Sequence, residues 1–415
     1  MYHATAGRAA ANINQIYRKD VIQSLVAPDE CLSTLLAMAV LRGNELGCAA
    51  ISDRPLLAAF PQLAGRLPWV GLGQFPTPVH SLSQASSDAV RPPANVHIKR
   101  DDLSAPLYGG NKVRTLEPLL AEALHQGAER VYSTGSYGSN HALATSIHAP
   151  RLGLVPGALL SPQPATRTAA LNLASLYLED CDVRILRHWS LIPYAMFRTQ
   201  REPGAWVMPP GGATPRGALG YVSAALELAE QVRDKQLPEP KRIVLAVGST
   251  CTSAGLLVGL ALARRMGLAF LKGVPLVHAV RVTPWPVTSP LRIAHLAWRA
   301  AGFLNQLGVS HRFTFAELRS GLVVDPDYLG AGYGEVSSSG QSAMERFGSF
   351  GRLALDTTYS AKAAAGLLRF ADQNTEESLF WSTKSSAPLP NQDPIERALP
   401  RCSDTTAEWL AKFVG

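Results

Sequence analysis

Several features that mark common classes of protein are missing from this sequence. No apolar run is long enough to cross a bilayer, since the longest near the N-terminus covers only residues 31–41. The first 20 residues lack the order of charge, apolar core and cleavage site that marks a signal peptide. The cysteines are odd in number and have no zinc-ligand spacing, which favours free thiols. They are Cys31, Cys48, Cys181, Cys251 and Cys402. We therefore expect a cytoplasmic protein with no membrane segment and no metal site.

Concentrated charge is also missing. Lys and Arg number 39 and Asp and Glu number 32, which gives a net charge of +7. The basic residues are scattered and are not interleaved with aromatics, so we expect no nucleic-acid partner, although anionic substrates could be attracted. With 47% hydrophobic and 17% charged residues, the chain should fold rather than stay disordered. A length of 415 residues allows two or more domains.

Short β-rich runs alternate with helical patterns along most of the chain. The expected strands cover residues 96–100, 129–134, 157–161, 182–186, 242–247 and 378–383. The expected helices cover residues 113–126, 141–152, 166–178, 215–235, 290–306 and 360–371. Repeated strand–helix units indicate parallel sheets covered by helices, which is an α/β fold. Residues 1–55 indicate two or three helices without a chemical motif.

Three glycine-rich turns each follow a strand and precede a helix, the place where α/β sheets bind ligands. The first is GGNK, residues 109–112. Its Lys112 is either a solvated surface lysine or a nucleophile that forms a Schiff base with a carbonyl compound. The usual aldehyde held in this way is pyridoxal 5′-phosphate.

The second turn is GSYGSNH, residues 135–141. Asn140 could donate an amide hydrogen bond to a ring hydroxyl or phenolate oxygen, Ser139 could hold or deprotonate a substrate, and His141 could steer a substrate carboxylate. Ser and Asn are also the usual residues that cap the N-terminus of a helix, and a cap needs no ligand. Both interpretations stay open at this point.

The third turn is GSTCT, residues 248–252, which follows the apolar run RIVLAV. Backbone N–H groups and the helix dipole make such a turn a good phosphate site, and three hydroxyl side chains add donors. No Gly-Lys-Ser/Thr follows and no GxGxxG is present, which disfavours ATP, GTP and dinucleotides. A plain strand-to-helix turn is the alternative. Together, the three turns supply the parts that hold one pyridoxal 5′-phosphate.

At this point the chain resembles a known family. KRDDLSAPLYGGNKVRTLEPLLAEAL, GSNH, PPGGATPRGALGYV, GSTCTSAGL, YLGAGYG and LDTTYSAKAAAGLL occur in the order typical of the D-cysteine desulfhydrase / 1-aminocyclopropane-1-carboxylate deaminase family. These are tryptophan-synthase-β-like, fold type II pyridoxal-phosphate enzymes. The resemblance covers roughly residues 70–385. It implies a two-domain α/β fold, with a large domain of residues 56–110 plus 212–400 and a small domain of residues 111–211. The N-terminal extension (1–55) and a C-terminal tail (401–415) lie outside it.

The resemblance also implies roles for single residues. Lys112 would hold the cofactor covalently and Asn140 would bond its 3′-oxygen, while Ser139 and His141 would face the substrate. The phosphate would lie on Gly248, Ser249, Thr250, Cys251 and Thr252. Tyr333 would lie near the ring and substrate, with a core aromatic as the alternative, and Tyr359 matches a further family tyrosine. Thr383 falls where desulfhydrase-like members place a hydroxyl near the pyridine nitrogen.

The sequence departs from the family pattern at three places. Thr250 and Cys251 replace two glycines of the phosphate turn, which demands a tolerable backbone conformation there. The stretch Ser349-Phe350-Gly351-Arg352 lacks the frequent Glu-Gly, so a glutamate partner for the ring nitrogen is absent. The usual Thr-Gly-Gly near the end is Thr383-Lys384-Ser385. These departures bear on substrate identity more than on cofactor binding.

Ser-Asn-His, instead of the Ser-Asn-Gln of the ring-opening deaminases, points to the desulfhydrase side of the family. We therefore expect a lyase, hydrolase or deaminase that acts on a small amino acid by α,β-elimination and releases pyruvate and ammonia. Lys112, Ser139 and Tyr333 are the expected catalytic residues. The alternatives are a 1-aminocyclopropane-1-carboxylate deaminase and a non-catalytic protein that binds an amino acid or a partner. The resemblance implies a homodimer.

Overall fold

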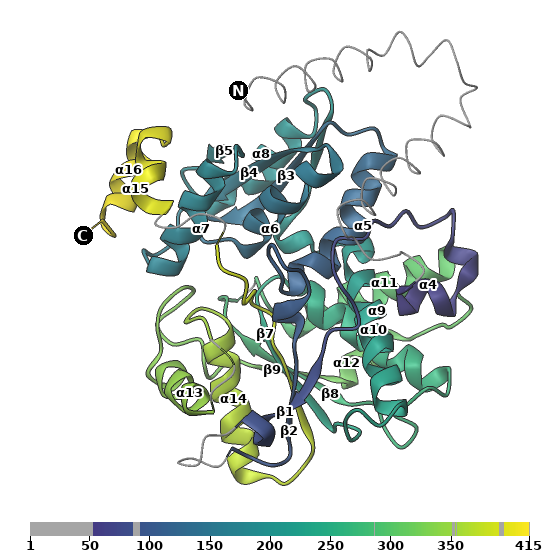
Figure 1. Cartoon of the computed structure of the whole chain (residues 1–415). Coiled ribbons are helices and arrows are strands. Elements are labelled where there is room, and N and C mark those ends of the chain that lie inside the picture. The colour runs from purple at the N-terminus through teal and green to yellow at the C-terminus, as the bar shows by residue number, and fades with distance from the viewer. Residues whose placement is uncertain are drawn as a thin grey trace, which may run out of the picture.

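The computed structural model describes residues 53–85, 92–285, 287–350, 353, 355–389 and 394–414. Two separate β-sheets, one of six strands and one of four, form its framework, and helices flank both of them (Figure 1). This confirms the α/β class expected from the sequence. The helices expected before residue 53 lie outside the described residues. Within the described residues, no helix has the length and apolar character needed to cross a membrane.

The large sheet has the strand order β1-β2-β10-β7-β8-β9, and only the β1–β2 pair is antiparallel. Its strands are β1 (Val79–Ser81), β2 (Val96–Lys99), β7 (Arg242–Val247), β8 (Leu276–Arg281), β9 (Leu322–Asp325) and β10 (Ser378–Trp381). The expected strands at residues 96–100, 242–247 and 378–383 are present to within two residues. Strand β10 lies between β2 and β7, so the end of the family-like region completes the centre of the sheet.

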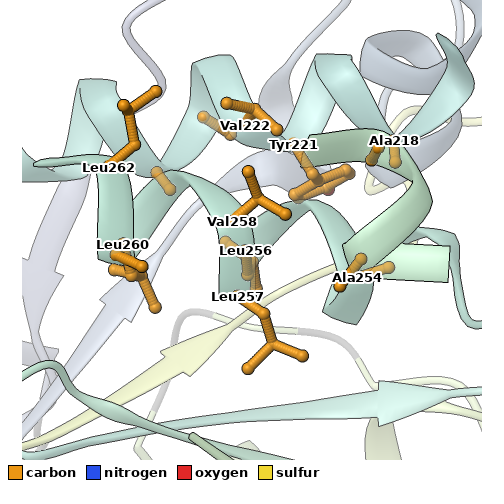
Figure 2. Close-up of a cluster of buried hydrophobic side chains, with 14 of the residues drawn as sticks. Ala218, Tyr221, Val222, Ala254, Leu256, Leu257, Val258, Leu260 and Leu262 are labelled. Carbon is orange, nitrogen blue, oxygen red and sulfur yellow. The ribbon is translucent and has the colours of Figure 1, made fainter. Parts of the chain in front are cut away.

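Alternating side chains of β7 point into different cores. Ile243, Leu245 and Val247 pack with the helices on one face, whereas Val244 and Ala246 pack with those on the other. The first face carries α4 (Pro55–Ala59), α9 (Pro215–Arg233), α10 (Cys251–Arg265), α11 (Pro290–Gln306) and α12 (Phe315–Ser320). The second carries α13 (Ser338–Ser349) and α14 (Ser360–Gln373). Figure 2 shows how α9 and α10 pack, with Tyr221 and Val222 next to Leu256 and Val258.

The small sheet is all parallel, with the order β5-β4-β3-β6. Its strands are β3 (Arg130–Ser136), β4 (Val155–Ser161), β5 (Asp182–Ile185) and β6 (Ala205–Val207). One core contains α5 (Asn111–His125), α6 (Asn140–His148) and α7 (Arg167–Leu178), and the opposite face packs on α8 (Ile192–Thr199). The strands of this sheet all come from residues 130–207. The domain limits at residues 110 and 211 stay a prediction, because sheet membership does not draw them.

Two short helices near the C-terminus join the core of the small sheet. They are α15 (Pro394–Ala398) and α16 (Asp404–Ala411), and they lie beside α7 (Figure 1). Ile395, Ala398 and Leu410 are buried there. The Trp409 ring meets Tyr137 edge-on, with centroids 5.1 Å apart. Since Tyr137 belongs to the second glycine-rich turn, part of the expected tail supports that turn.

Replacing Trp409 by alanine should therefore weaken the small-sheet lobe and the second turn together. Trp409 is half-buried, so we expect a loss of about 2 kcal/mol in the free energy of unfolding, below the range for fully buried tryptophan. Urea denaturation measures this loss, and hydrogen exchange should rise at residues 135–141. Glu408→Ala is the control, because Glu408 is exposed on the same helix. Equal effects of the two substitutions would contradict this support.

Candidate functional site

Lys112 lies in the first turn of α5, where the loops that follow β7 and β10 meet it. Its Nζ donates to the Ser249 Oγ at 3.1 Å, which joins the first and third glycine-rich turns across 137 residues of sequence. The Asn111 N–H donates to the Thr383 carbonyl at 2.9 Å. Gly110 has φ +87°, and a Cβ there would lie 2.7 Å from that carbonyl oxygen. The segment after β10 thus fits against the start of α5 because residue 110 is glycine.

The surroundings of Lys112 favour a neutral amine. Loss of water around the Nζ lowers the pKa of Lys112, and the nearby Cys251 thiol only partly opposes this. Within the described residues, no carboxylate forms a salt bridge with it. Burial raises the pKa of Cys251 to about 11, so this thiol stays protonated. An uncharged amine of this kind is a nucleophile toward a carbonyl carbon.

In the third turn, only one of the two residues that replace glycine has an unusual backbone conformation. Thr250 has φ +55° and ψ −24°, a left-handed conformation that is uncommon for a β-branched residue. Cys251, in contrast, is the first residue of α10 and is helical. The demand on backbone conformation that the sequence predicts therefore falls on Thr250 alone. Strain of this kind is of the order of 1–3 kcal/mol and tends to lie at functional sites.

No side chain caps the N-terminus of α10. The Cys251 N–H donates to the Ser249 carbonyl, so the first-turn N–H groups without an acceptor among the described residues are those of Thr252 and Ser253. Such groups suit an anion, and the helix dipole adds to the attraction. The Asn111 Nδ2 donates to Thr252 Oγ1 at 3.0 Å, and Thr288 Oγ1 donates to the Gly248 carbonyl at 2.6 Å. These bonds fix both ends of the turn. The Ser249 contact brings this turn to Lys112, and the phosphate-binding role of residues 248–252 stays a prediction.

In the second turn, Ser139 is the N-cap of α6, since its Oγ accepts the Ala142 N–H at 3.2 Å. The capping interpretation is thus correct, and the hydroxyl proton stays available for a further acceptor. His141 is the second residue of α6, and only 2% of its surface is exposed to solvent. Neither of its ring nitrogens has a hydrogen-bond partner in the described structure. Burial is the largest of the causes that lower the pKa of His141 to about 3, so the ring is neutral.

Asn140 is held by three donors that all reach its Oδ1. These are Tyr108 OH at 3.1 Å, Asn172 Nδ2 at 2.9 Å and Lys384 Nζ at 2.9 Å. Asn172 also donates to the Gly138 carbonyl at 2.9 Å, which fixes the turn behind Asn140. Because the amide oxygen is used in this way, the amide NH₂ of Asn140 is turned the other way.

Tyr333 and Tyr359 form a pair of phenols at the same side of the molecule as the second turn. Their hydroxyls are 2.7 Å apart, and Ser136 Oγ donates to Tyr333 OH at 3.3 Å. Burial raises the pKa of Tyr333, and burial together with Tyr333 raises that of Tyr359 well above its usual value. Both phenols therefore stay protonated. The Tyr359 ring also lies 3.4 Å from the position of a Cβ on Gly248, which links this pair to the third turn.

Sequence reasoning missed several contributors to this site. Tyr108 and Lys384 were not expected to meet Asn140. Gly211, with φ +64°, lies so close to the third turn that a Cβ would be 2.1 Å from Ser249 Cβ and 3.4 Å from Lys112 Nζ. The only available signal was the Gly-Gly pair at residues 211–212. The stretch expected to lack a glutamate is described up to Phe350, which is buried in the large-sheet core.

Comparisons with known proteins agree on one relationship. A family model described as pyridoxal-phosphate dependent enzyme matches residues 70–380. D-cysteine desulfhydrase from Klebsiella pneumoniae subsp. pneumoniae is 31% identical over 323 residues, which are 74% of this chain and 92% of that protein. Nocardicin C-9′ epimerase from Nocardia uniformis subsp. tsuyamanensis is 33% identical over 333 residues, 78% and 94% of the two chains. Among solved structures, an ACC deaminase homologue has a TM-score of 0.63 and 27% identity, and covers 84% of this chain and 99% of its own.

Proposed function

Because this chain belongs to the family of pyridoxal-phosphate dependent enzymes, we propose that it catalyses α,β-elimination on a small amino acid, with D-cysteine as the first candidate. D-cysteine and water would give pyruvate, ammonia and hydrogen sulfide. The observation that carries the proposal is the contact of Lys112 Nζ with Ser249 Oγ at 3.1 Å. It places a lysine of lowered pKa beside an uncapped helix N-terminus, in a chain 31% identical to a D-cysteine desulfhydrase.

The residues present fit pyridoxal 5′-phosphate. Lys112 would hold its aldehyde, the turn from Gly248 to Thr252 would take the phosphate, and the Asn140 amide would donate to the ring oxygen. The unpartnered ring nitrogens of His141 fit a polar group that comes with the ligand, since buried polar atoms are normally hydrogen-bonded. When bound, the cofactor supplies a ring that withdraws electrons from the substrate α-carbon.

Lys112 would also serve as the base. A neutral amine can take a proton from the substrate α-carbon, and the burial that lowers the pKa of Lys112 favours this neutral form. A Cβ at residue 211 would lie 3.4 Å from the Nζ, so glycine at this position leaves space beside the amine.

The second turn would bind the substrate carboxylate. Ser139 keeps its hydroxyl proton for donation because its lone pair accepts the Ala142 N–H. A neutral His141 can donate one hydrogen bond as well. Tyr333 and Tyr359, both protonated and 2.7 Å apart, would lie on the other side of the substrate, where they can donate a proton to a leaving thiolate. Thr383 would face the pyridine nitrogen with a hydroxyl group, which leaves that nitrogen uncharged.

Pyruvate release from the purified, cofactor-loaded enzyme tests this proposal. We expect product from D-cysteine and β-chloro-D-alanine, and at least tenfold less from the L-enantiomers, because the carboxylate and the base act on fixed sides of the substrate. Hydrogen sulfide measured in parallel should equal pyruvate for D-cysteine. Tyr333→Phe is expected to lower kcat by about a hundredfold. No pyruvate from any small amino acid would remove elimination as the function.

The solved ACC deaminase homologue supports one second candidate, deamination of 1-aminocyclopropane-1-carboxylate. The same assay covers it, with 2-oxobutyrate as the product. His141 disfavours it, since the ring-opening deaminases carry glutamine at this position. Membership in an enzyme family disfavours the non-catalytic alternative, and none of these relatives supports the expectation of a hydrolase.

We also propose a homodimer in the cytoplasm. The cysteines within the described part of the chain, Cys181, Cys251 and Cys402, are free thiols, which suits a reducing compartment. Exposed Leu291 and Trp298 are seven residues apart on α11, hence on the same face, and offer apolar area for a second copy. Analytical ultracentrifugation of the loaded enzyme measures the oligomeric state.

A further inference from the structure

Lys384 extends from the loop after β10 toward the lobe that carries the second turn. Its Nζ donates to Tyr108 OH and to Asn140 Oδ1, both at 2.9 Å, and lies 5.2 Å from the Tyr108 ring centroid. In the described structure, no carboxylate lies within ion-pair distance of it. Asp356, whose carboxyl feels the charge of Lys384, already accepts the backbone N–H groups of Tyr359 and Ser360. Lys384 is therefore a cation that is held by neutral oxygens.

The contact decides which way the Asn140 amide points. Lys384 and Asn172 are donors only at the atoms that reach Asn140, so the atom they meet must be the oxygen. The Tyr108 hydroxyl accepts from Lys384 and donates its own O–H to the same oxygen. The Asn140 NH₂ is left without a partner among the described residues, and it is available to a ligand oxygen. A charged donor makes the strongest of these bonds.

Lys384 directly follows Thr383 in the chain, and its side chain reaches Asn140. Its two ends therefore lie at two residues that are expected to contact the cofactor. In pyridoxal 5′-phosphate, the pyridine nitrogen, the methyl-bearing carbon and the carbon with the phenolate oxygen are consecutive along one edge of the ring. Thr383 would face the nitrogen end of this edge and Asn140 the oxygen end. Lys384 runs from the first to the second. The family pattern has glycine at this position, which carries no side chain to fill the edge.

We propose that Lys384 is a positioning residue that closes this edge of the cofactor site, fixes the Asn140 amide and places a positive charge behind that amide, one amide group away from the phenolate oxygen of the cofactor. The inference rests on the proposed function, because it assigns Lys384 to the same cofactor site. A positive charge at this short range stabilises the phenolate form. It also disfavours a proton on the neighbouring ring nitrogen, in agreement with a hydroxyl partner at Thr383.

Binding of two ligands by apoprotein tests the proposal without any turnover. The ligands are pyridoxal 5′-phosphate and its 3-deoxy analogue, which lacks the ring oxygen, and the variant is Lys384→Met, which keeps the length of the side chain. We expect the variant to bind pyridoxal 5′-phosphate about tenfold more weakly, the size of one charge-assisted hydrogen bond. It should bind the deoxy analogue within about twofold of the wild type. Lys272→Met, at an exposed lysine, should change neither constant.

A purely structural role for Lys384 would weaken both ligands by the same factor, and that result overturns the proposal. Equal binding of pyridoxal 5′-phosphate by wild type and variant overturns it as well. A wild-type protein that binds neither ligand contradicts the proposed function instead, so the two failures are distinguishable. Should Lys384→Met not fold, the same pair of ligands is compared with Lys384→Gln. This variant keeps an amide donor without the charge, and the same selective loss is expected.

Discussion

Replacing Lys112 by alanine is expected to abolish both the colour and the activity of the protein. Wild-type protein saturated with pyridoxal 5′-phosphate should absorb visible light, because the bond between the Nζ and the aldehyde carbon extends the conjugation of the ring. Without the Nζ, this band should disappear. Pyruvate formation should fall by about three orders of magnitude or more, since the variant loses a nucleophile and a base at one position.

Two controls separate this role from a structural one. Lys272→Ala, at an exposed lysine, should keep the band and the full activity. The Lys112→Ala apoprotein should unfold at a urea concentration near that of the wild type, because the Nζ makes one hydrogen bond, to Ser249. Reduction with borohydride, digestion and mass spectrometry should place the cofactor on the peptide that contains Lys112. A visible band that persists in Lys112→Ala would show that another lysine holds the cofactor.

The three turns of the site were predictable because each consists of a few consecutive residues with a recognisable pattern. A lysine on a Gly-Gly turn, a Ser-Asn pair before a helix and a hydroxyl-rich turn after an apolar strand can each be recognised alone. Parallel strands bring the first and third turns to one edge of the large sheet, whereas the second turn follows β3 of the small sheet. The contact of Lys112 with Ser249 follows from this topology, although its distance does not.

The contacts that cross between distant segments were not predictable in this way. Lys384 meets Tyr108 across 276 residues and Asn140 across 244, and nothing in the sequence around Lys384 points to either partner. Thr250 illustrates a second limit. The sequence shows that two glycines are replaced in the third turn, but only the backbone angles show that Thr250 rather than Cys251 takes the left-handed conformation.

The helices and strands also fall into two groups, those that the sequence predicts and those that it does not. Most long strands and helices have a clear period, and β7, α9, α11 and α14 were expected to within a few residues, whereas α13 was not expected. Strands β1, β6 and β9 are three or four residues long, too short for alternation to be recognised, and all three lie at sheet edges. The helices α15 and α16 owe their burial to α7 and Tyr137, so tertiary packing rather than local pattern defines them.

Arg114→Met is expected to destabilise the protein by about 3–5 kcal/mol, because it removes one member of a buried ionic network. Arg114 pairs with Asp101 at 2.8 Å and with Glu227 at 2.9 Å, and Lys99 pairs with Glu227 as well. All four side chains are at most 3% exposed. Without Arg114, two buried carboxylates face one cation. The free energy of unfolding from urea titrations measures the loss.

This network supports the site, since Arg114 lies two residues after Lys112 on α5 and Asp101 accepts the Gly110 N–H through its carbonyl at 2.8 Å. The Arg114→Met apoprotein should therefore bind pyridoxal 5′-phosphate more weakly as well as unfold more easily. Arg346→Met is the matched control. Arg346 pairs with Asp372 at 2.9 Å, but both side chains are well exposed, so the expected loss is at most about 1 kcal/mol. A loss of the same size in both variants would contradict a special contribution from burial.

The destabilisation caused by Arg114→Met should depend on pH in one direction. Burial alone would raise the pKa of Glu227, but the charges of Arg114 and Lys99 outweigh it and lower the pKa to about 2. An unfolded glutamate has a pKa of about 4.3. The ionised Glu227 therefore contributes its stability fully above this value and loses it as the pH falls toward 2. Arg114→Met weakens that contribution, so the difference in unfolding free energy between wild type and variant should be constant near neutral pH and should narrow below about pH 4. A gap that stays unchanged down to pH 3 would mean that lost packing of the arginine stem, rather than lost charge, causes the destabilisation.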